Sequence, residues 1–476
     1  MRRWIVGAGA VISRGKGRDM KTRREVLRDL SALTIGAATW GLTQGTARAQ
    51  ARKFPGTTLN VLSSSGHRQL DPIWNRLNDL EQETGIKVNL TRVPTGEIRQ
   101  KIMQDLAMGT GQFDVYEPPD DTIFSASQYL APLEPYIKKD FGSVEAWGKY
   151  TVPWALKAAA IRGDVRCHPY YSGTVASAYR EDLWKDAKNR ADFGAKFGYE
   201  LPTPPKNWKE LIDAATFFTR QEKGEQLWGV VFPGKQDPGL NIFEMTVFEE
   251  GVEYLDDQNH SLWGPKHPEN QPTVTKVAGY LQDLIYKYKV APTTIPGMAT
   301  NESVDLYLNG KAAMIVDLIY FAWNEFTSKK VTDRIGKSIS FEVPSSTGAG
   351  KGGIPFYWMW GINGKSAKKD AAWEFVRWVL REDNMKLALT KGIGVFVPTD
   401  TRIADWAASE NILPPAVVAA IKRDQVYRLN PQIGQVRNTV RLSVEKLHLK
   451  ELTPEQFTQQ SGNAVEQLMV STGLAK

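Results

Sequence analysis

The chain has 476 residues, of which 42% are hydrophobic, with a formal charge of +7 and one cysteine, Cys167. This length is sufficient for two or three hydrophobic cores and too great for a single one. One cysteine excludes an internal disulfide, and we expect Cys167 to be a buried small residue and not a nucleophile.

The first 49 residues have the pattern of an export signal. The pair Arg23-Arg24 precedes a mildly apolar run over 30–42, and small residues follow at Ala47 and Ala49. A charged start, an apolar middle and small residues two apart are typical of a signal peptide, and paired arginines favour the twin-arginine route. The run is shorter than the roughly 20 residues that span a bilayer. We therefore expect cleavage after about Ala49 and a periplasmic protein that is not inserted in the membrane, with Met1 and Met20 both open as the start.

The leader accounts for the basic charge of the chain. Residues 1–49 carry 10 of the 60 Lys and Arg and 3 of the 53 Asp and Glu, so the remaining residues hold as many basic as acidic groups. Binding to nucleic acid needs a cationic surface. The composition therefore argues against a nucleic-acid partner for the cleaved protein.

Strand and helix patterns alternate directly after the leader, with helix ends at Gly85 and Gly109. Parallel strands need a crossover helix between them, so the order β-α-β-α-β predicts a parallel, doubly wound α/β sheet. The predicted strands are 58–62, 86–90 and 113–116, and the predicted helices are 70–85 and 98–106.

Two polar loops, 63–67 and 117–122, follow the first and third of these strands. Ligands of doubly wound sheets bind at the carboxyl ends of strands. The two loops are therefore the first candidates for a ligand site.

A second domain is expected after an extended crossing segment over 165–171. Its clearest element is a helix over 208–218, for which Asn207 is a suitable N-cap and Glu210 completes a capping box. Further expected elements are strands at 175–179, 227–232 and 340–343, helices at 243–248 and 273–288, a helix end at Gly310 with a strand within 308–317, a linker over 345–353 and a helix with a buried stripe over 372–380.

No motif for a cofactor, metal or catalytic centre stands out. Gly348, Gly350 and Gly353 have the spacing of a dinucleotide loop, but an apolar aromatic run over 354–360 follows where a helix is required. The five histidines lack metal-ligand spacing, and no zinc- or serine-hydrolase signature is present. We expect neither a cofactor nor a metal.

Several segments together carry a family resemblance. They are the leader, the opening strand and helix, 109–116, the Pro-Pro-x-x-Trp-x-Glu-Leu stretch of 204–211, the Gly-Lys-Ala-Ala-Met element of 310–314, and 366–380. In this order they resemble the extracellular solute-binding proteins of ABC importers, in the sugar-binding, maltose-binding-protein-like family 1. The resemblance implies the type II periplasmic-binding-protein fold, with two α/β lobes joined by a hinge that close on a ligand. By analogy the lobes are 55–163 with 356–397, and 165–353 with 399–476.

The resemblance also implies which residues contact the ligand. A neutral sugar presents hydroxyls at its edges and a C–H face, which call for carboxylates and amides and for aromatic planes, respectively. Tyr320 takes the position of an aromatic residue that stacks on sugar in the family. For Tyr171 and Trp358 the alternative is packing at the hinge, and for His67 it is capping of the next helix. The candidate ligand-binding residues are His67, Glu117, Asp121, Tyr171, Asn241, Glu244, Asp317, Tyr320 and Trp358.

The expected function is therefore a non-catalytic, monomeric receptor that captures a carbohydrate and delivers it to the transmembrane subunits of an ABC permease. Two alternatives stay open. One is a binder of another small solute, such as a polyamine, an organic anion or a polyol phosphate. The other is a secreted carbohydrate-active enzyme, which would also be exported and rich in aromatic residues.

Overall fold

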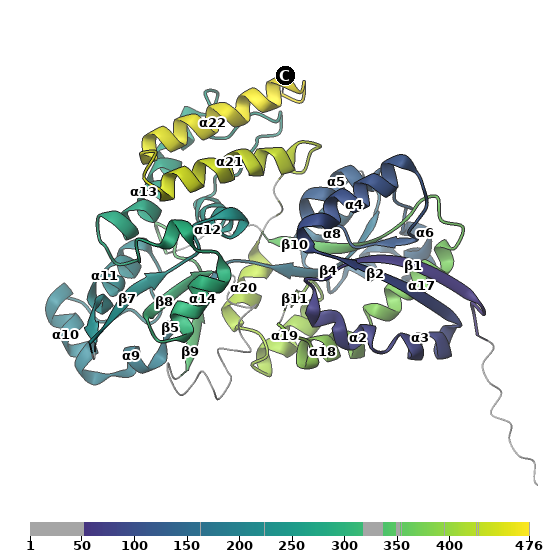
Figure 1. Cartoon of the computed structure of the whole chain (residues 1–476), viewed down its shortest axis with the longest axis horizontal. Helices are drawn as coiled ribbons and strands as arrows, with labels where there is room; N and C mark the ends of the chain where they lie inside the picture. The colour runs from purple at the N-terminus through teal and green to yellow at the C-terminus, as the bar shows by residue number, and fades with distance from the viewer. Residues whose placement is uncertain are drawn as a thin grey trace, which may run out of the picture. The chain divides into compact units, whose positions relative to one another are not determined.

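The computed structural model describes residues 52–161, 163–222, 224–317, 337–348, 353, 355–394, 396–424, 426 and 428–475. These residues form an α/β structure with two mixed β-sheets and helices around each of them (Figure 1). No helix in the described part of the chain is both long and apolar enough to cross a membrane.

The first sheet has six strands in the order β11-β4-β10-β3-β1-β2. Strands β1, β2 and β3 are parallel, as the sequence predicts. The other three join by antiparallel pairing, so the whole sheet is mixed and not parallel throughout. The bounds are β1 Thr57–Ser64, β2 Ile86–Val93, β3 Val115–Tyr116, β4 Cys167–Gly173, β10 Phe356–Ile362 and β11 Val397–Pro398.

Helices from both ends of the chain cover the first sheet. Helices α3, α4 and α17 pack on β2 and β1, α5 and α17 pack on β10, and α8 packs on β4. The helical elements of this part are η1 Arg68–Leu70, α2 Asp71–Trp74, α3 Leu77–Thr84, α4 Thr95–Met108, α5 Asp120–Ser127, α6 Glu134–Phe141, α7 Val144–Gly148, α8 Pro153–Ala159, α17 Lys369–Val379, α18 Glu382–Lys391 and α19 Thr401–Ser409.

The predicted helix over 70–85 is divided into η1, α2 and α3. The backbone leaves helical geometry at Arg76, whose guanidinium donates to Asp79 in the next turn and to Asn384 of α18. The predicted end is confirmed, since Gly85 caps α3 with φ +86°, a conformation that glycine adopts without steric cost.

The second sheet has five strands in the order β6-β7-β8-β5-β9, with β7 and β8 parallel and the other pairs antiparallel. The predicted helix over 208–218 is confirmed as α11, and Asn207 accepts a hydrogen bond from the amide of Glu210. The bounds are β5 Ala176–Arg180, β6 Arg220–Glu222, β7 Glu225–Val231, β8 Ala312–Asp317, β9 Ser338–Phe341, α9 Glu181–Lys185, α10 Ala187–Phe197, α11 Trp208–Phe218, α14 Thr300–Leu308 and α20 Pro415–Arg423.

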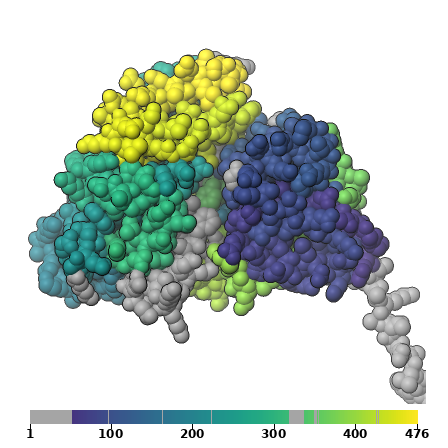
Figure 2. Space-filling view, in the orientation of Figure 1, coloured from purple at the N-terminus to yellow at the C-terminus, as the bar shows by residue number. Residues whose placement is uncertain are grey.

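Four longer helices pack on one another beside the second sheet. They are α12 Gln236–Glu249, α13 Gln271–Tyr286, α21 Ile433–His448 and α22 Pro454–Ser471, and short 3-10 turns lie at η2 Pro268–Asn270 and η3 Ile295–Gly297. Helix α21 packs on both α12 and α22, and α22 packs on α13. The last two helices form the continuous yellow surface in Figure 2. This group brings the C-terminal part of the chain against α12, which follows β7 in sequence.

The chain passes from the first sheet to the second between β4 and β5, over residues 174–175. The segment predicted as an extended crossing over 165–171 is thus largely strand β4, which pairs with β10 inside the first sheet. Helix α20 packs on β4 and β11 as well as on β9, so it contacts both sheets. The lobe boundaries inferred from the family resemblance remain a prediction.

Most of the tryptophans of the described chain are part of the core. Trp184, Trp208, Trp263 and Trp360 are fully buried. Cys167 is also buried, as expected, and burial raises the pKa of its thiol to about 12.

Candidate functional site

A cavity of about 210 Å³ lies at the carboxyl ends of the parallel strands of the first sheet, facing residues of α12 and α21. The loops after β1, β2 and β3 contribute one side of it, because the carboxyl ends of neighbouring parallel strands meet at one edge. The residues around the cavity are Gly66, His67, Thr95, Arg99, Pro119, Asp120, Tyr171, Asp237, Asn241, Phe356, Trp358 and Arg437.

Glu117 organises the edge of the sheet beneath this cavity. Its fully buried carboxylate follows β3 and accepts hydrogen bonds from the hydroxyl of Ser63 (2.6 Å) and the amide of Ser64 (2.9 Å), both at the end of β1. It also accepts from the hydroxyl of Tyr170 and from Nδ1 of His67. Burial by itself raises the pKa of Glu117, but the charge of His67 and these hydrogen bonds outweigh it, so the pKa is lowered. Glu117 is therefore an ionised group that holds other residues in place.

His67 is the polar group that Glu117 presents to the cavity. Because Nδ1 is bound to the carboxylate, Nε2 is the ring nitrogen left to face a ligand. The imidazole stacks on Tyr171 with ring centroids 5.0 Å apart and is roughly perpendicular to the Trp358 ring, with centroids 4.3 Å apart. One polar atom is thus embedded in an aromatic wall.

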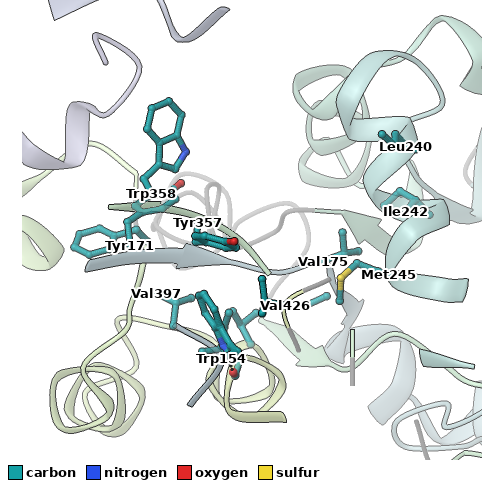
Figure 3. Close-up of a cluster of buried hydrophobic side chains, with 14 of the residues drawn as sticks. Trp154, Tyr171, Val175, Leu240, Ile242, Met245, Tyr357, Trp358, Val397 and Val426 are labelled. Carbon is teal, nitrogen blue, oxygen red and sulfur yellow. Dashed lines mark hydrogen bonds between the residues drawn. The ribbon is translucent and has the colours of Figure 1, made fainter. Parts of the chain in front are cut away.

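The aromatic wall is built on paired strands. Tyr171 of β4 and Trp358 of β10 are direct cross-strand partners, and Figure 3 shows their side chains on these neighbouring strands. Phe396 stacks on the other face of Tyr171 at 5.5 Å. Strand pairing therefore fixes the position of the aromatic side chains.

The opposite side of the cavity is organised by Arg437 of α21. Its Nε and Nη2 donate to the two carboxylate oxygens of Glu244 at 2.8 and 3.0 Å, and Nη2 also donates to Asn241 Oδ1 at 3.1 Å. Glu244 and Asn241 lie on successive turns of α12, and Tyr254 donates its hydroxyl to Glu244. The third nitrogen, Nη1, lies 3.9 Å from Asp120 Oδ2 at the start of α5.

Arg99 and two neighbouring aspartates form a second charged group. Nε of Arg99, one turn into α4, lies 2.8 Å from each carboxylate oxygen of Asp121. Burial lowers the pKa of Arg99, but Asp121, Asp120 and Asp237 outweigh this effect and raise it. Asp120 is itself buried, and burial raises its pKa to about 6 against the opposing effect of Arg437.

The structure brings most of the predicted ligand residues to this cavity, in two ways. His67, Tyr171, Asn241 and Trp358 line it directly. Glu117, Asp121 and Glu244 instead hold the lining residues His67, Arg99 and Arg437.

Of the other two predicted residues, the structure describes only Asp317, which does not line the cavity. Asp317 is fully buried at the end of β8, where it accepts hydrogen bonds from the hydroxyls of Thr300 and Ser303 in α14. It therefore ties α14 to the second sheet. Tyr320 lies outside the described residues.

Eight lining residues were not among the predicted ligand residues: Gly66, Thr95, Arg99, Pro119, Asp120, Asp237, Phe356 and Arg437. Thr95 and Arg99 follow the second predicted strand at a spacing of four, so the rule that selected the first and third loops also applies to them. No sequence pattern indicated Arg437, because its position at the cavity depends on the packing of α21 against α12.

A larger cavity of about 480 Å³ lies elsewhere, beside Tyr129, Tyr136 and the end of α4. Its buried carboxylate, Asp105, already accepts hydrogen bonds from Thr110, the amides of Gln112 and Phe113, and Tyr116. None of the predicted ligand residues lines this cavity.

Comparison with known proteins places this chain in a family. The model of the bacterial extracellular solute-binding protein family matches residues 67–386. The probable amino-acid ABC transporter periplasmic-binding protein y4oP of Sinorhizobium fredii is 23% identical over 473 residues, 95% of this chain and 99% of the relative. The erythritol/L-threitol-binding protein of Mycolicibacterium smegmatis is 21% identical over 409 residues, 79% of each chain.

Solved structures share the fold. An ABC transporter solute-binding protein from Agrobacterium radiobacter K84, in complex with ribitol, has a TM-score of 0.66 at 18% identity, covering 88% of this chain and 100% of that chain. The fold is thus the type II periplasmic-binding-protein fold that the sequence predicts. Because the family model spans more than half of the chain, the chain belongs to the bacterial extracellular solute-binding proteins.

Proposed function

We propose that this protein is the periplasmic binding component of an ABC importer and captures a small, uncharged sugar or polyol in the 210 Å³ cavity. The observation that carries the proposal is the combination of an aromatic wall with a ring of hydrogen-bonding side chains. Trp358 and Phe356 line the cavity and offer ring surface to a C–H face, and His67, Asn241 and Asp120 offer polar atoms to hydroxyls.

The size of the cavity favours a small ligand. Sites for drug-sized ligands have volumes of about 300–1,000 Å³, which exceeds the volume found here. We therefore propose a monosaccharide or a short polyol and not an oligosaccharide. Relatives described as binding erythritol or ribitol support this choice of ligand class.

The charges of the site argue against anionic ligands and against a free amino acid. A carboxylate or phosphate is normally held by an arginine fork. Here Arg99 is engaged by Asp121, and Arg437 by Glu244 and Asn241. The name of the Sinorhizobium relative, which refers to amino acids, therefore does not decide the ligand of this chain.

We propose binding without chemical conversion. Residues of the first sheet and its loops lie on one side of the cavity and residues of α12 and α21 on the other, so a ligand that contacts both sides stabilises the closed arrangement. The closed, loaded form would then be recognised by the transmembrane permease subunits, and the receptor would act as a monomer in the periplasm after removal of its leader. Incubation with oligosaccharides followed by product analysis tests for an enzyme, and cleavage would contradict this proposal.

A ligand screen with a matched pair of variants tests the binding site. The purified chain is screened by thermal shift against monosaccharides, polyols, amino acids and organic acids, because a ligand at 100 times its Kd stabilises the folded state by about 2.7 kcal/mol. Hits are then titrated by calorimetry with wild type, His67→Gln and His267→Gln. His67 lines the cavity, whereas His267 is paired with Asp256 and Glu269 elsewhere.

We expect a sugar or polyol to shift the transition, with a Kd at least about tenfold weaker in His67→Gln and unchanged in His267→Gln. A shift by amino acids or organic acids alone would contradict the proposed ligand class. Equal affinity in both variants would contradict the proposed site.

A further inference from the structure

The described residues around the cavity carry an excess of negative charge. The guanidinium groups are those of Arg99 and Arg437, and the carboxylates at the wall or directly bound to it are those of Asp120, Asp121, Asp237 and Glu244. The two cations are thus opposed by four carboxylates, with the His67–Glu117 pair set aside.

The positions of these groups matter as much as their number. Asp121 and Glu244 lie behind the arginines and are used to hold them. Asp120 and Asp237 line the cavity itself, Asp120 buried at the start of α5 and Asp237 exposed in the first turn of α12. A ligand therefore meets carboxylates from two sides of the cavity, and it meets arginines that are already paired with a carboxylate, Arg99 through Nε and Arg437 through Nε and Nη2.

The aromatic side chains of the cavity also favour a positively charged ligand. Trp358, Tyr171 and Phe356 are part of the lining. Aromatic faces attract ammonium groups, and the attraction is stronger where water is displaced. Carboxylates and aromatic faces in one cavity are thus a suitable environment for a cation.

We propose that the cavity selects among polyhydroxylated ligands by charge. A sugar or polyol that carries a protonated amine binds more tightly than its neutral parent, and one that carries a carboxylate or phosphate binds more weakly. This inference rests on the proposed function and extends it to a ligand class, aminated polyols and amino sugars. The physical cause is the excess of carboxylates over guanidinium groups around the cavity, with Asp120 and Asp237 in the lining itself.

Two sets of ligands that differ only in charge test the proposal. The first is D-sorbitol, 1-amino-1-deoxy-D-sorbitol and D-gluconate, and the second is D-glucose, D-glucosamine and D-glucuronate. Each is titrated by calorimetry at pH 7.5 in low salt and again in 0.5 M salt. We expect the aminated member of a set to bind about tenfold more tightly than its neutral parent in low salt, and the carboxylate to bind at least about tenfold more weakly.

The variant Asp237→Asn and a matched control distinguish the effect of charge at the cavity from the effect of the net charge of the protein. Asp237→Asn should reduce the ratio of affinities between aminated and neutral ligand about threefold or more, with little change for the neutral parent. Asp405→Asn changes the net charge equally, but Asp405 pairs with Lys422 between α19 and α20 and should leave the ratio unchanged. High salt should reduce the ratio in wild type, because screening weakens exposed charges.

The outcomes distinguish this inference from the proposed function. If the neutral members bind and the aminated ones bind no better, charge selection is wrong while the receptor function stands. If only aminated members bind, charge selection stands and the proposed neutral ligand is wrong. Tight binding of gluconate or glucuronate would overturn the inference, and no binding in either set would overturn both.

Discussion

Glu117 lies beside the cavity, but its role in the structure differs from the predicted one. The sequence predicts it as a ligand contact, but its carboxylate lies under His67 and is used by four donors. A carboxylate with this many donors, fully buried, fixes the loop after β1 against the end of β3. Its role in the proposed site is therefore to position His67.

Replacing Glu117 by Gln should lower the free energy of unfolding by about 1–3 kcal/mol at pH 7. The amide removes the charge and turns one acceptor oxygen into a donor that faces other donors. Urea unfolding followed by tryptophan fluorescence measures the change. Glu451→Gln, at an exposed residue, is the control and should stay within about 0.5 kcal/mol of wild type.

The same pair of proteins should differ in pH dependence. Because the pKa of Glu117 is lowered from its ordinary value of 4.5, its stabilising effect is complete above that pH and is lost as the pH falls further. The difference in unfolding free energy between wild type and Glu117→Gln should therefore shrink below about pH 4.5. A constant difference down to pH 3 would show that Glu117 is not held in its ionised form.

At the scale of elements, the predicted bounds of a helix were correct where an N-cap residue and the spacing of apolar residues indicated the same helix. The helix over 208–218 has both, and its observed bounds are Trp208–Phe218. The helix predicted over 243–248 begins earlier, at Gln236, so its first turn contains Pro238, a position at which proline is tolerated. The turns that the prediction omitted carry Asp237 and Asn241 to the cavity.

Two glycine substitutions test the element boundaries in opposite directions. Gly85→Ala should destabilise the protein by about 1–2 kcal/mol or more, because φ is +86° and a Cβ would lie 2.9 Å from the backbone of Phe54. Gly279→Ala, within α13, should stabilise it by about 0.5–1 kcal/mol, since its Cβ would make only an ordinary contact of 3.9 Å with Pro454. Thermal and urea unfolding measure both changes in stability. Two changes in the same direction would contradict the assignment of Gly85 to a helix end and of Gly279 to a helix interior.

At the scale of the whole molecule, segments far apart in the chain meet at the site. His67 follows the first strand, whereas Arg437 lies in the last helix but one. The first sheet likewise takes β10 and β11 from beyond residue 355, after the second sheet is complete. The site therefore depends on the assembly of the full chain.

The export proposal concerns the whole chain as well. We expect the protein recovered from the periplasm to begin at about Gln50, as shown by its mass and N-terminal sequence. Replacing Arg23 and Arg24 together by Lys should leave the uncleaved precursor in the cytoplasm. The same change at Arg14 and Arg18 is the control and should not affect export. Normal processing of the first variant would show that another route is used.

The sequence by itself determined the alternation of strands and helices over the first three strands, the loops at the carboxyl ends of β1 and β3 and, through a resemblance, the family of the chain. These features depend on local pattern and on the crossover rule for parallel strands, which relate neighbouring residues. Together with the family resemblance, they were sufficient to predict four residues that line the cavity, namely His67, Tyr171, Asn241 and Trp358.

Only the tertiary structure decided which of the predicted residues face the cavity and what surrounds them. The antiparallel entry of β10 pairs Trp358 with Tyr171, and the packing of α21 on α12 brings Arg437 to Glu244. Asp317 followed the same sequence rule as the cavity residues, yet it is bound to the hydroxyls of α14. The first two contacts join residues almost 200 positions apart, so no periodicity or cap along the chain encodes them.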